Sequence, residues 1–246
     1  MCSVTWLQHL NGFELFCNRD ERRTRKPALA PQVWDGGVRF LAPVDGQAGG
    51  TWIGVNELGL AVCLLNGPLT LASKEGGESR GLLVSSLLHK KDVASARRAL
   101  RAADLDVFQA FRLLLFETGR PPAVLFWDGA GLRQETAAES RIPLVSSSRD
   151  LKKAFERRRE LLDRLVAEHG GMSPAALEAF HRSHEPEKGP WSPCMHRDDA
   201  STVSASRVVV TADRVEIHYA PGPLCEARFM EPLVLRRTPR EEFARR

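Results

Sequence analysis

The sequence has no apolar run that approaches the ~20 residues of a membrane-spanning helix. Its N-terminus lacks the basic and apolar segments of a signal peptide. The net charge is only +4, with basic and acidic residues mixed along the chain, so charge indicates neither a nucleic acid nor a membrane as partner. The five cysteines are odd in number and contain no C-x-x-C pair, which argues against a disulfide framework. These absences predict a cytoplasmic protein without membrane insertion.

Common cofactor and catalytic signatures are also missing. The sequence has no G-x-G-x-x-G, Walker A, G-x-S-x-G or H-E-x-x-H motif, so we expect no cofactor and neither serine-hydrolase nor zinc-protease chemistry. His181-x-x-His184 and Cys194-x-His196 supply ligand types for zinc. Their spacing matches no standard zinc module, however, and we interpret them as a site without metal.

The composition, with 43% hydrophobic and 27% charged residues, is typical of a globular protein. We expect one domain over residues 1–246, of which 236–246 form a charged, frayed tail. Turn signals and apolar runs predict antiparallel hairpins at 2–21, 51–65 and 203–220, a strand pair at 123–136, helices at 82–103, 105–117, 150–169 and 173–184, and loops at 22–50 and 71–81. This order favours sheets covered by helical layers.

The N-terminal stretch carries the strongest local signal. Asn11-Gly12 favours a two-residue type I′ hairpin turn. That turn would place Cys2 opposite Glu21 and Cys17 opposite Trp6. By strand alternation, Arg19 and Glu21 would share the face of Cys2, whereas Asp20 would not.

This arrangement suits a nucleophile. Removal of Met1 would leave Cys2 with a thiol and a free α-amine, whose reference pKa values of about 8.5 and about 7.7–8.0 let the amine act as general base. Arg19 would favour the thiolate, and a neighbouring acid could hold the amine. The alternative is an ordinary terminal cysteine beside an ordinary charged loop.

Cys2 followed by Asn18-Arg19-Asp20-Glu21 resembles the NRDE family, whose eukaryotic members include the transport and Golgi organisation protein 2 homologues. That family looks like a branch of the N-terminal nucleophile (Ntn) hydrolases, close to penicillin V acylase, bile salt hydrolase and isopenicillin N acyltransferase. Residues 54–68 are similar to the "G-x-N-E-x-G-L … L-N-x-P" stretch of those relatives. There the last Asn, here Asn66, contributes to the oxyanion hole. Residues 194–204 and 219–225 resemble the C-terminal part of the acyltransferase-like relatives. This resemblance favours a pocket-edge role for His196 over a catalytic one.

The resemblance implies an α+β fold, a four-layer αββα sandwich, and an amidase or acyltransferase that cleaves a small-molecule acyl-amide through a Cys2 thioester. It implies catalytic roles for Cys2, Arg19, Asp20 and Asn66, and substrate-binding roles for Asn18, Glu21 and His196. In the penicillin acylase relatives two residues separate the Arg from the Asp, so either Asp20 or Glu21 could hold the α-amine; the family motif favours Asp20.

A non-catalytic carrier of haem or lipid is the alternative function, because some NRDE proteins have been linked to such handling. It ranks second, since the chain has no haem-attachment C-x-x-C-H. The sequence is compatible with a homo-oligomer and leaves the acyl and amine specificity open.

Overall fold

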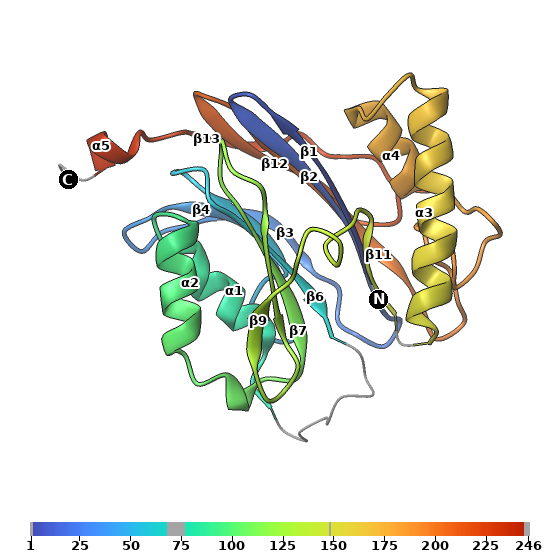
Figure 1. Ribbon diagram of the computed structural model, residues 1–246, viewed down its shortest axis with the longest axis horizontal. Coiled ribbons are helices and arrows are strands. Elements are labelled where there is room, and N and C mark those ends of the chain that lie inside the picture. The colour runs from blue at the N-terminus through green and yellow to red at the C-terminus, as the bar shows by residue number, and fades with distance from the viewer. Residues whose placement is uncertain (1, 68–76, 148, 244–246) are drawn as a thin grey trace.

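Two antiparallel sheets are stacked face to face, and helices cover the outer side of each (Figure 1). The computed structural model describes residues 2–67, 77–147 and 149–243. Sheet A contains, in spatial order, β10 (Leu144–Ser146), β1 (Cys2–His9), β2 (Gly12–Arg22), β11 (Ala200–Val210), β12 (Arg214–Ala220) and β13 (Leu233–Arg236). Sheet B contains β3 (Leu29–Trp34), β4 (Phe40–Val44), β5 (Ile53–Asn56), β6 (Ala61–Asn66), β7 (Phe111–Phe116), β8 (Ala123–Trp127) and β9 (Leu132–Gln134).

Three apolar layers hold these elements together. Alternate side chains of the two sheets meet in the central layer, where the rings of Phe13 and Phe116 stack 5.4 Å apart. A second layer joins sheet B to α1 and α2, and a third joins sheet A to α3 and α4. The helices are α1 (Arg80–Leu88), α2 (Val93–Ala102), α3 (Leu151–Glu168), α4 (Pro174–Arg182) and the terminal α5 (Arg240–Phe243), with a 3₁₀ turn at Leu105–Val107. The predicted four-layer αββα sandwich is confirmed.

The register of the first hairpin differs from the prediction. Leu10 and Asn11 form the turn, and Gly12 begins β2 opposite His9. Gly12 does not have a positive φ. Glycine fits this position because the neighbouring backbone lies very close: a Cβ there would be 1.9 Å from the carbonyl oxygen of Val210. The pairing is therefore shifted by two residues, which preserves the face of every side chain.

The shift changes the residues that face each other. Cys2 lies opposite Arg19 rather than Glu21, and Cys17 lies opposite Val4 rather than Trp6. Because the shift is even, Cys2, Arg19 and Glu21 still share a face of sheet A, whereas Asp20 points to the other.

Several other predicted elements are wrong. The expected loop at 22–50 contains β3 and the fully buried β4. The expected helix at 82–103 is divided into α1 and α2 by a capping box at Asp92 and Ser95. The expected helix at 105–117 is a 3₁₀ turn followed by β7. Of the expected loop at 71–81, residues 71–76 lie outside the described part.

The later elements agree better with the sequence. Asp150 caps α3 by accepting a hydrogen bond from Lys153 N, and Ser173 caps α4 with Pro174 at its first position. The charged tail, which we expected to fray, is docked at its start. Thr238 is buried and donates through its backbone N–H to Glu57 O at 2.7 Å.

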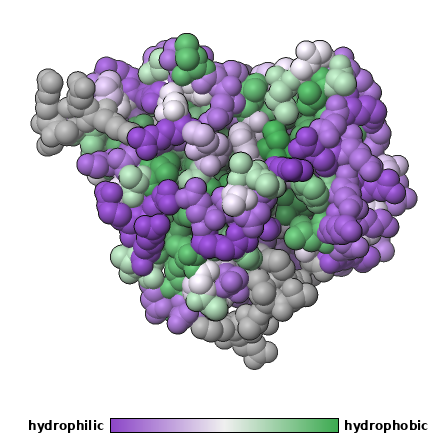
Figure 2. All heavy atoms as spheres, in the orientation of Figure 1, coloured by the Kyte–Doolittle hydropathy of each residue, from purple (hydrophilic) through white to green (hydrophobic). Residues whose placement is uncertain are grey.

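The face shown in Figure 2 is mostly hydrophilic, and hydrophobic side chains are scattered over it in small patches. Within the described ranges, no helix has both the length and the apolar character required to cross a membrane.

Candidate active site

Cys2 is positioned by strands on both sides. It begins β1, opposite Arg19 of β2 and Ser146 of β10, and its side chain is only 8% exposed. Burial raises the pKa of the thiol to about 12, against the opposing effect of a hydrogen bond from the Asp20 backbone. The thiol is therefore protonated at neutral pH and needs a base before it can attack a substrate.

Arg19 lies on the face of Cys2, but other groups engage its guanidinium. It forms a short ion pair with Asp45, lies 3.7 Å from Glu21 Oε2, and stacks 4.3 Å from the centre of the Trp52 ring. Asp45 also accepts two hydrogen bonds from Arg25. These partners offset part of the positive charge, so Arg19 favours a Cys2 thiolate less than the sequence suggested.

Asp20 points to the opposite face of sheet A, toward the helices. Thr202 Oγ1 donates to Asp20 Oδ1 at 2.6 Å and accepts from Met195 N at 2.8 Å. Arg158 Nη2 lies 4.0 Å from Asp20 Oδ2, and both side chains are fully buried. Burial raises the pKa of Asp20, and the Arg158 charge opposes that rise.

Arg158 is a site residue that the sequence prediction missed. Its guanidinium donates to Ser3 Oγ at 2.7 Å and to Trp191 O at 3.2 Å. The residue is fully buried on α3, between the buried Ala154 and Leu162. The sequence did contain a signal for it. Arg158 is four residues after Ala154 and four before Leu162, and this spacing places its charge on the apolar face of the helix. The buried guanidinium links α3, β1 and the loop before β11.

Ser146 is a second residue that was missed, because β10 was not predicted. It lies directly opposite Cys2 in the β1–β10 pairing, so the two side chains lie on the same face of sheet A. Its Oγ is buried and has no hydrogen-bond partner among the described residues. A buried, unsatisfied hydroxyl costs free energy unless another group meets it. Its position beside the thiol makes it a candidate donor to a bound substrate.

Asn18 does not lie on the substrate side. It pairs with Ser3 and is fully buried on the helix-facing side of β2, where its amide donates to His181 O at 2.8 Å and to Pro193 O at 3.0 Å. This geometry favours a positioning role over substrate contact. His181 itself is a core residue that hydrogen-bonds Thr5 Oγ1 at 2.9 Å, and burial lowers its pKa to about 3.

Asn66 ends β6, opposite Phe111, with its side chain exposed. The preceding Leu65 shares the central apolar layer with Cys2, and β6 packs near β10. Its strand thus approaches the Cys2 neighbourhood from sheet B. The segment that follows, 68–76, lies outside the described residues. An oxyanion role for Asn66 stays a prediction.

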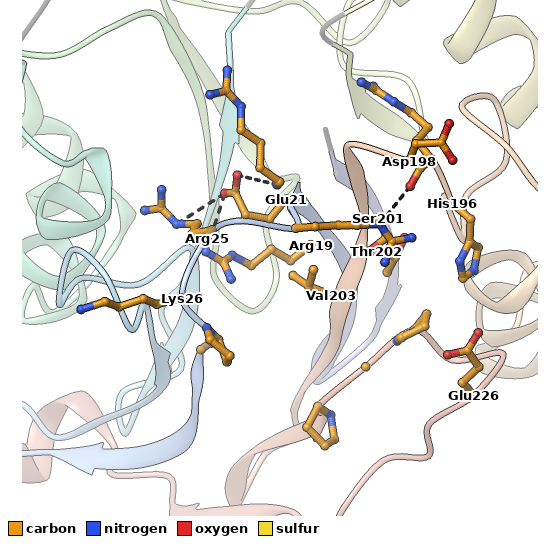
Figure 3. A pocket seen from close by; sticks show the side chains of 18 of the residues that line it. Arg19, Glu21, Arg25, Lys26, His196, Asp198, Ser201, Thr202, Val203 and Glu226 are labelled. Carbon is orange, nitrogen blue, oxygen red and sulfur yellow. Dashed lines mark hydrogen bonds and ion pairs between the residues drawn. The ribbon is translucent and has the colours of Figure 1, made fainter.

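A cavity of about 820 Å³ opens beside this site. Figure 3 shows Arg19, Glu21, Arg25 and Lys26 on one wall, with His196 and Glu226 on the opposite wall. Seven Arg and Lys side chains line the cavity against three acidic ones. Cys2 is not among the lining residues. The surplus of cations makes the cavity attractive to an anionic group.

His196 borders this cavity, but its ring is directed into a group that we call the cysteine–histidine cluster. The four ligand-type atoms of the cluster all lie within 4.8 Å of one another. Its members are His184, Cys194, His196 and Cys225.

Solved structures with a similar fold are N-terminal nucleophile hydrolases. Penicillin V acylase from Agrobacterium tumefaciens has 13% identity and a TM-score of 0.50, with 90% of this chain and 83% of that chain covered. A mutant of conjugated bile acid hydrolase from Clostridium perfringens has 11% identity and a TM-score of 0.56, with 96% and 92% covered. An N-acylethanolamine-hydrolyzing acid amidase orthologue from Caenorhabditis elegans has 12% identity and a TM-score of 0.55, with 84% and 92% covered. The fold is therefore that of the Ntn hydrolases.

The chain belongs to the Transport and Golgi organisation 2 family, whose sequence model matches residues 1–192. The predicted relationship to this family is confirmed, and so is the predicted Ntn-hydrolase fold. A search of curated proteins found no match.

Proposed function

We propose that this chain is a cysteine Ntn amidohydrolase that cleaves a linear acyl-amide, or transfers its acyl group, once Met1 has been removed. The observation that carries the proposal is the buried charge network beside the candidate nucleophile. Isolated charges are costly in a protein interior, and a buried Asp20–Arg158 pair does not by itself stabilise a fold. Perturbed ionisable groups of this kind cluster at functional sites.

The proposed reaction begins with proton transfer. The Cys2 thiol, protonated because its pKa is raised, gives its proton to the α-amine of the same residue. Its sulfur then forms a bond to the amide carbonyl carbon. Asp20 holds the α-amine, and Thr202 and Arg158 fix Asp20 in turn. The latter two are positioning residues because they act through the carboxylate.

The tetrahedral intermediate needs donors for its oxygen. Asn66 supplies one in this proposal, and the Ser146 hydroxyl opposite Cys2 is a second candidate. The carbon–nitrogen bond breaks as the protonated α-amine returns its proton to the leaving amine, which leaves a Cys2 thioester. Water then adds to the thioester and releases the carboxylic acid with the free thiol. A second amine in place of water would give acyl transfer.

The lining of the cavity supports a proposal for the substrate class. Cationic side chains dominate its lining, which favours a substrate with a carboxylate or another anionic group over a wholly apolar ligand. Arg19 and Glu21 connect this cavity to the face that carries Cys2. We therefore expect N-acylated amino acids to be better substrates than neutral N-acyl amines.

The test is amine release by protein whose intact mass shows that Met1 is absent. We expect turnover of N-acyl amino acids with the wild type and none with Cys2→Ala. A homogeneous Met1-bearing protein that hydrolyses amides equally well would exclude the α-amine as base. Tight stoichiometric binding of haem or lipid, with no turnover of any acyl-amide, would instead support the carrier function.

A further inference from the structure

The cysteine–histidine cluster brings together three segments of the chain. His184 follows the end of α4, Cys194 and His196 lie in the loop before β11, and Cys225 lies in the turn after β12. Three of these four residues lie beyond residue 192, where the match to the family model ends. The family match therefore does not assign this cluster.

The distances within the cluster are those of ligands around one ion. His196 Nε2 lies 3.2 Å from His184 Nε2, 3.6 Å from Cys194 Sγ and 3.4 Å from Cys225 Sγ. The two sulfur atoms are 3.5 Å apart. Zinc bonds of about 2.3 Å to sulfur and about 2.0–2.1 Å to nitrogen, in a tetrahedron, place neighbouring ligand atoms about 3.4–3.8 Å apart. These four separations fall in or close to this range, and all four ligand atoms lie within 4.8 Å of one another.

Hydrogen bonding alone does not satisfy this geometry. A ring nitrogen carries either one proton or one lone pair, yet His196 Nε2 faces three polar atoms at once. Four ligand-type atoms gathered within 4.8 Å of one another can be satisfied together by one cation. Two sulfur and two imidazole ligands in a tetrahedron are the donor set of structural zinc.

We propose that the cysteine–histidine cluster is a structural zinc site. All four tetrahedral positions are supplied by the protein, which leaves none open for a substrate or an activated water. With both cysteines bound as thiolates, the two negative charges balance the charge of Zn²⁺. The sequence had favoured no metal, because the spacing of His181-x-x-His184 and Cys194-x-His196 matches no standard zinc module. In the structure Cys225, 29 residues beyond His196, completes the cluster, whereas His181 faces the core.

The metal would fix the loop that supports the candidate active site. This loop supplies Trp191 O to Arg158 and Pro193 O to Asn18. It also supplies Met195 N to Thr202 Oγ1, which in turn holds Asp20. Zinc at the cluster would tie this loop to the end of α4 and to the turn after β12, and so hold the partners of Asp20 in place.

The test measures metal rather than turnover, so its outcome is independent of the amidase proposal. Protein purified with a reductant is analysed for zinc by mass spectrometry, and metal-free protein is titrated with Zn²⁺ alone. We expect one zinc per chain, competition by a chromogenic chelator, and the absorption bands of tetrahedral cobalt–thiolate after substitution with Co²⁺.

Variants sharpen the result. Cys225→Ser, in a partly exposed turn, is expected to fold and to lose the zinc, and Cys194→Ser is expected to lose it as well. Cys2→Ser and His169→Gln, whose side chains lie outside the cluster, are matched controls that should keep it. Far-UV circular dichroism checks the fold. If Cys225→Ser unfolds, the cobalt spectrum of the wild type still decides.

Two results would overturn the proposal. One is a wild-type protein that binds no zinc after full reduction. The other is an unchanged zinc content when both Cys194 and Cys225 are replaced by serine.

Discussion

The guanidinium of Arg158 and the carboxylate of Asp20 lie 4.0 Å apart, and neither side chain is exposed to solvent. Each charge depends on the other, because an isolated ion in the interior pays a large desolvation cost. Arg158 also reaches Ser3 and Trp191. One side chain therefore connects the start of β1, the helix that covers sheet A and the loop before β11.

Replacement of Arg158 tests this connection. Arg158→Met should lower the free energy of unfolding by about 3–5 kcal/mol, because it leaves Asp20 buried without its cation. Urea denaturation measures the change. Arg157→Gln, which removes an exposed pair with Glu160, should cost less than ~1 kcal/mol. Equal effects of the two substitutions would show that Arg158 is not a structural centre of the site.

The second prediction concerns stability against pH. The folded pKa of Asp20 lies above its ordinary 3.8 because of burial, so the folded state binds this proton more tightly than the unfolded state. Its stabilising contribution is present below that unfolded value and is lost as the pH rises through the folded pKa. The stability of Asp20→Asn relative to the wild type should therefore increase from about pH 4 upward.

Asp45 gives the opposite sign and serves as the control. Although burial works against it, hydrogen bonds from Arg25 and the Ala48 amide hold the pKa of Asp45 below its ordinary value. Its contribution is present above the unfolded pKa and lost as the pH falls through the folded one. Asp45→Asn should lose stability relative to the wild type as the pH rises. Parallel pH profiles for the two variants would contradict at least one of the two assignments.

Cys2 should matter for turnover far more than for stability. Cys2→Ala should abolish amide cleavage, while the free energy of unfolding falls by about 1 kcal/mol for one buried sulfur. Cys63→Ala, at a fully buried position of β6, should cost as much stability or more and keep the activity. Amine-release kinetics and urea denaturation separate the two effects. Full activity in Cys2→Ala would end the Ntn interpretation of this chain.

Asn66→Ala should reduce kcat about 10²–10³-fold if its amide donates to the tetrahedral oxygen. KM should change little, because the contact forms only in the transition state. Stability should also change little, since the side chain is exposed. Asn11→Ala, in the exposed turn of the first hairpin, is the matched control. A raised KM with unchanged kcat would assign Asn66 to ground-state binding.

Ser146→Ala should lower activity without lowering stability. The buried hydroxyl has no partner among the described residues, so its removal should leave the free energy of unfolding unchanged or raise it by up to about 1 kcal/mol. Ser192→Ala is the contrast, because its hydroxyl donates to Gly189 O or Cys194 O and should cost about 1 kcal/mol. Unchanged kcat and KM in Ser146→Ala would exclude contact with the substrate.

Local patterns in the sequence predicted the elements that carry strong end signals. Asp150 and Ser173 mark the starts of α3 and α4, and both cap those helices. The apolar run at Phe111–Phe116 has no alternation that would distinguish a strand from a helix, because residues on both of its faces are buried. Pro31 and Pro43 suggested a loop at 22–50, although both lie within strands.

Within the candidate site, sequence distance decided what could be predicted. The neighbourhood of Cys2 and Arg19 follows from a local hairpin, so it survived an error of two residues in register. Arg158 and Cys225 meet their partners only through tertiary packing, 155 and 29 residues away in the chain. For Arg158, the one local sign was its charge on the apolar face of α3. For Cys225, the local sequence held no sign of its partners.

The strands of the two sheets come from different parts of the chain. The seven strands of sheet B come from one continuous stretch, 29–134, whereas sheet A combines the first 22 residues with strands from 144 onward. During synthesis, all the strands of sheet B leave the ribosome before β1 and β2 can pair with β10 and β11. Long-range pairing of this kind is slow. We expect sheet B to gain protection from hydrogen exchange first in refolding, with Cys2 reaching its final surroundings among the last residues.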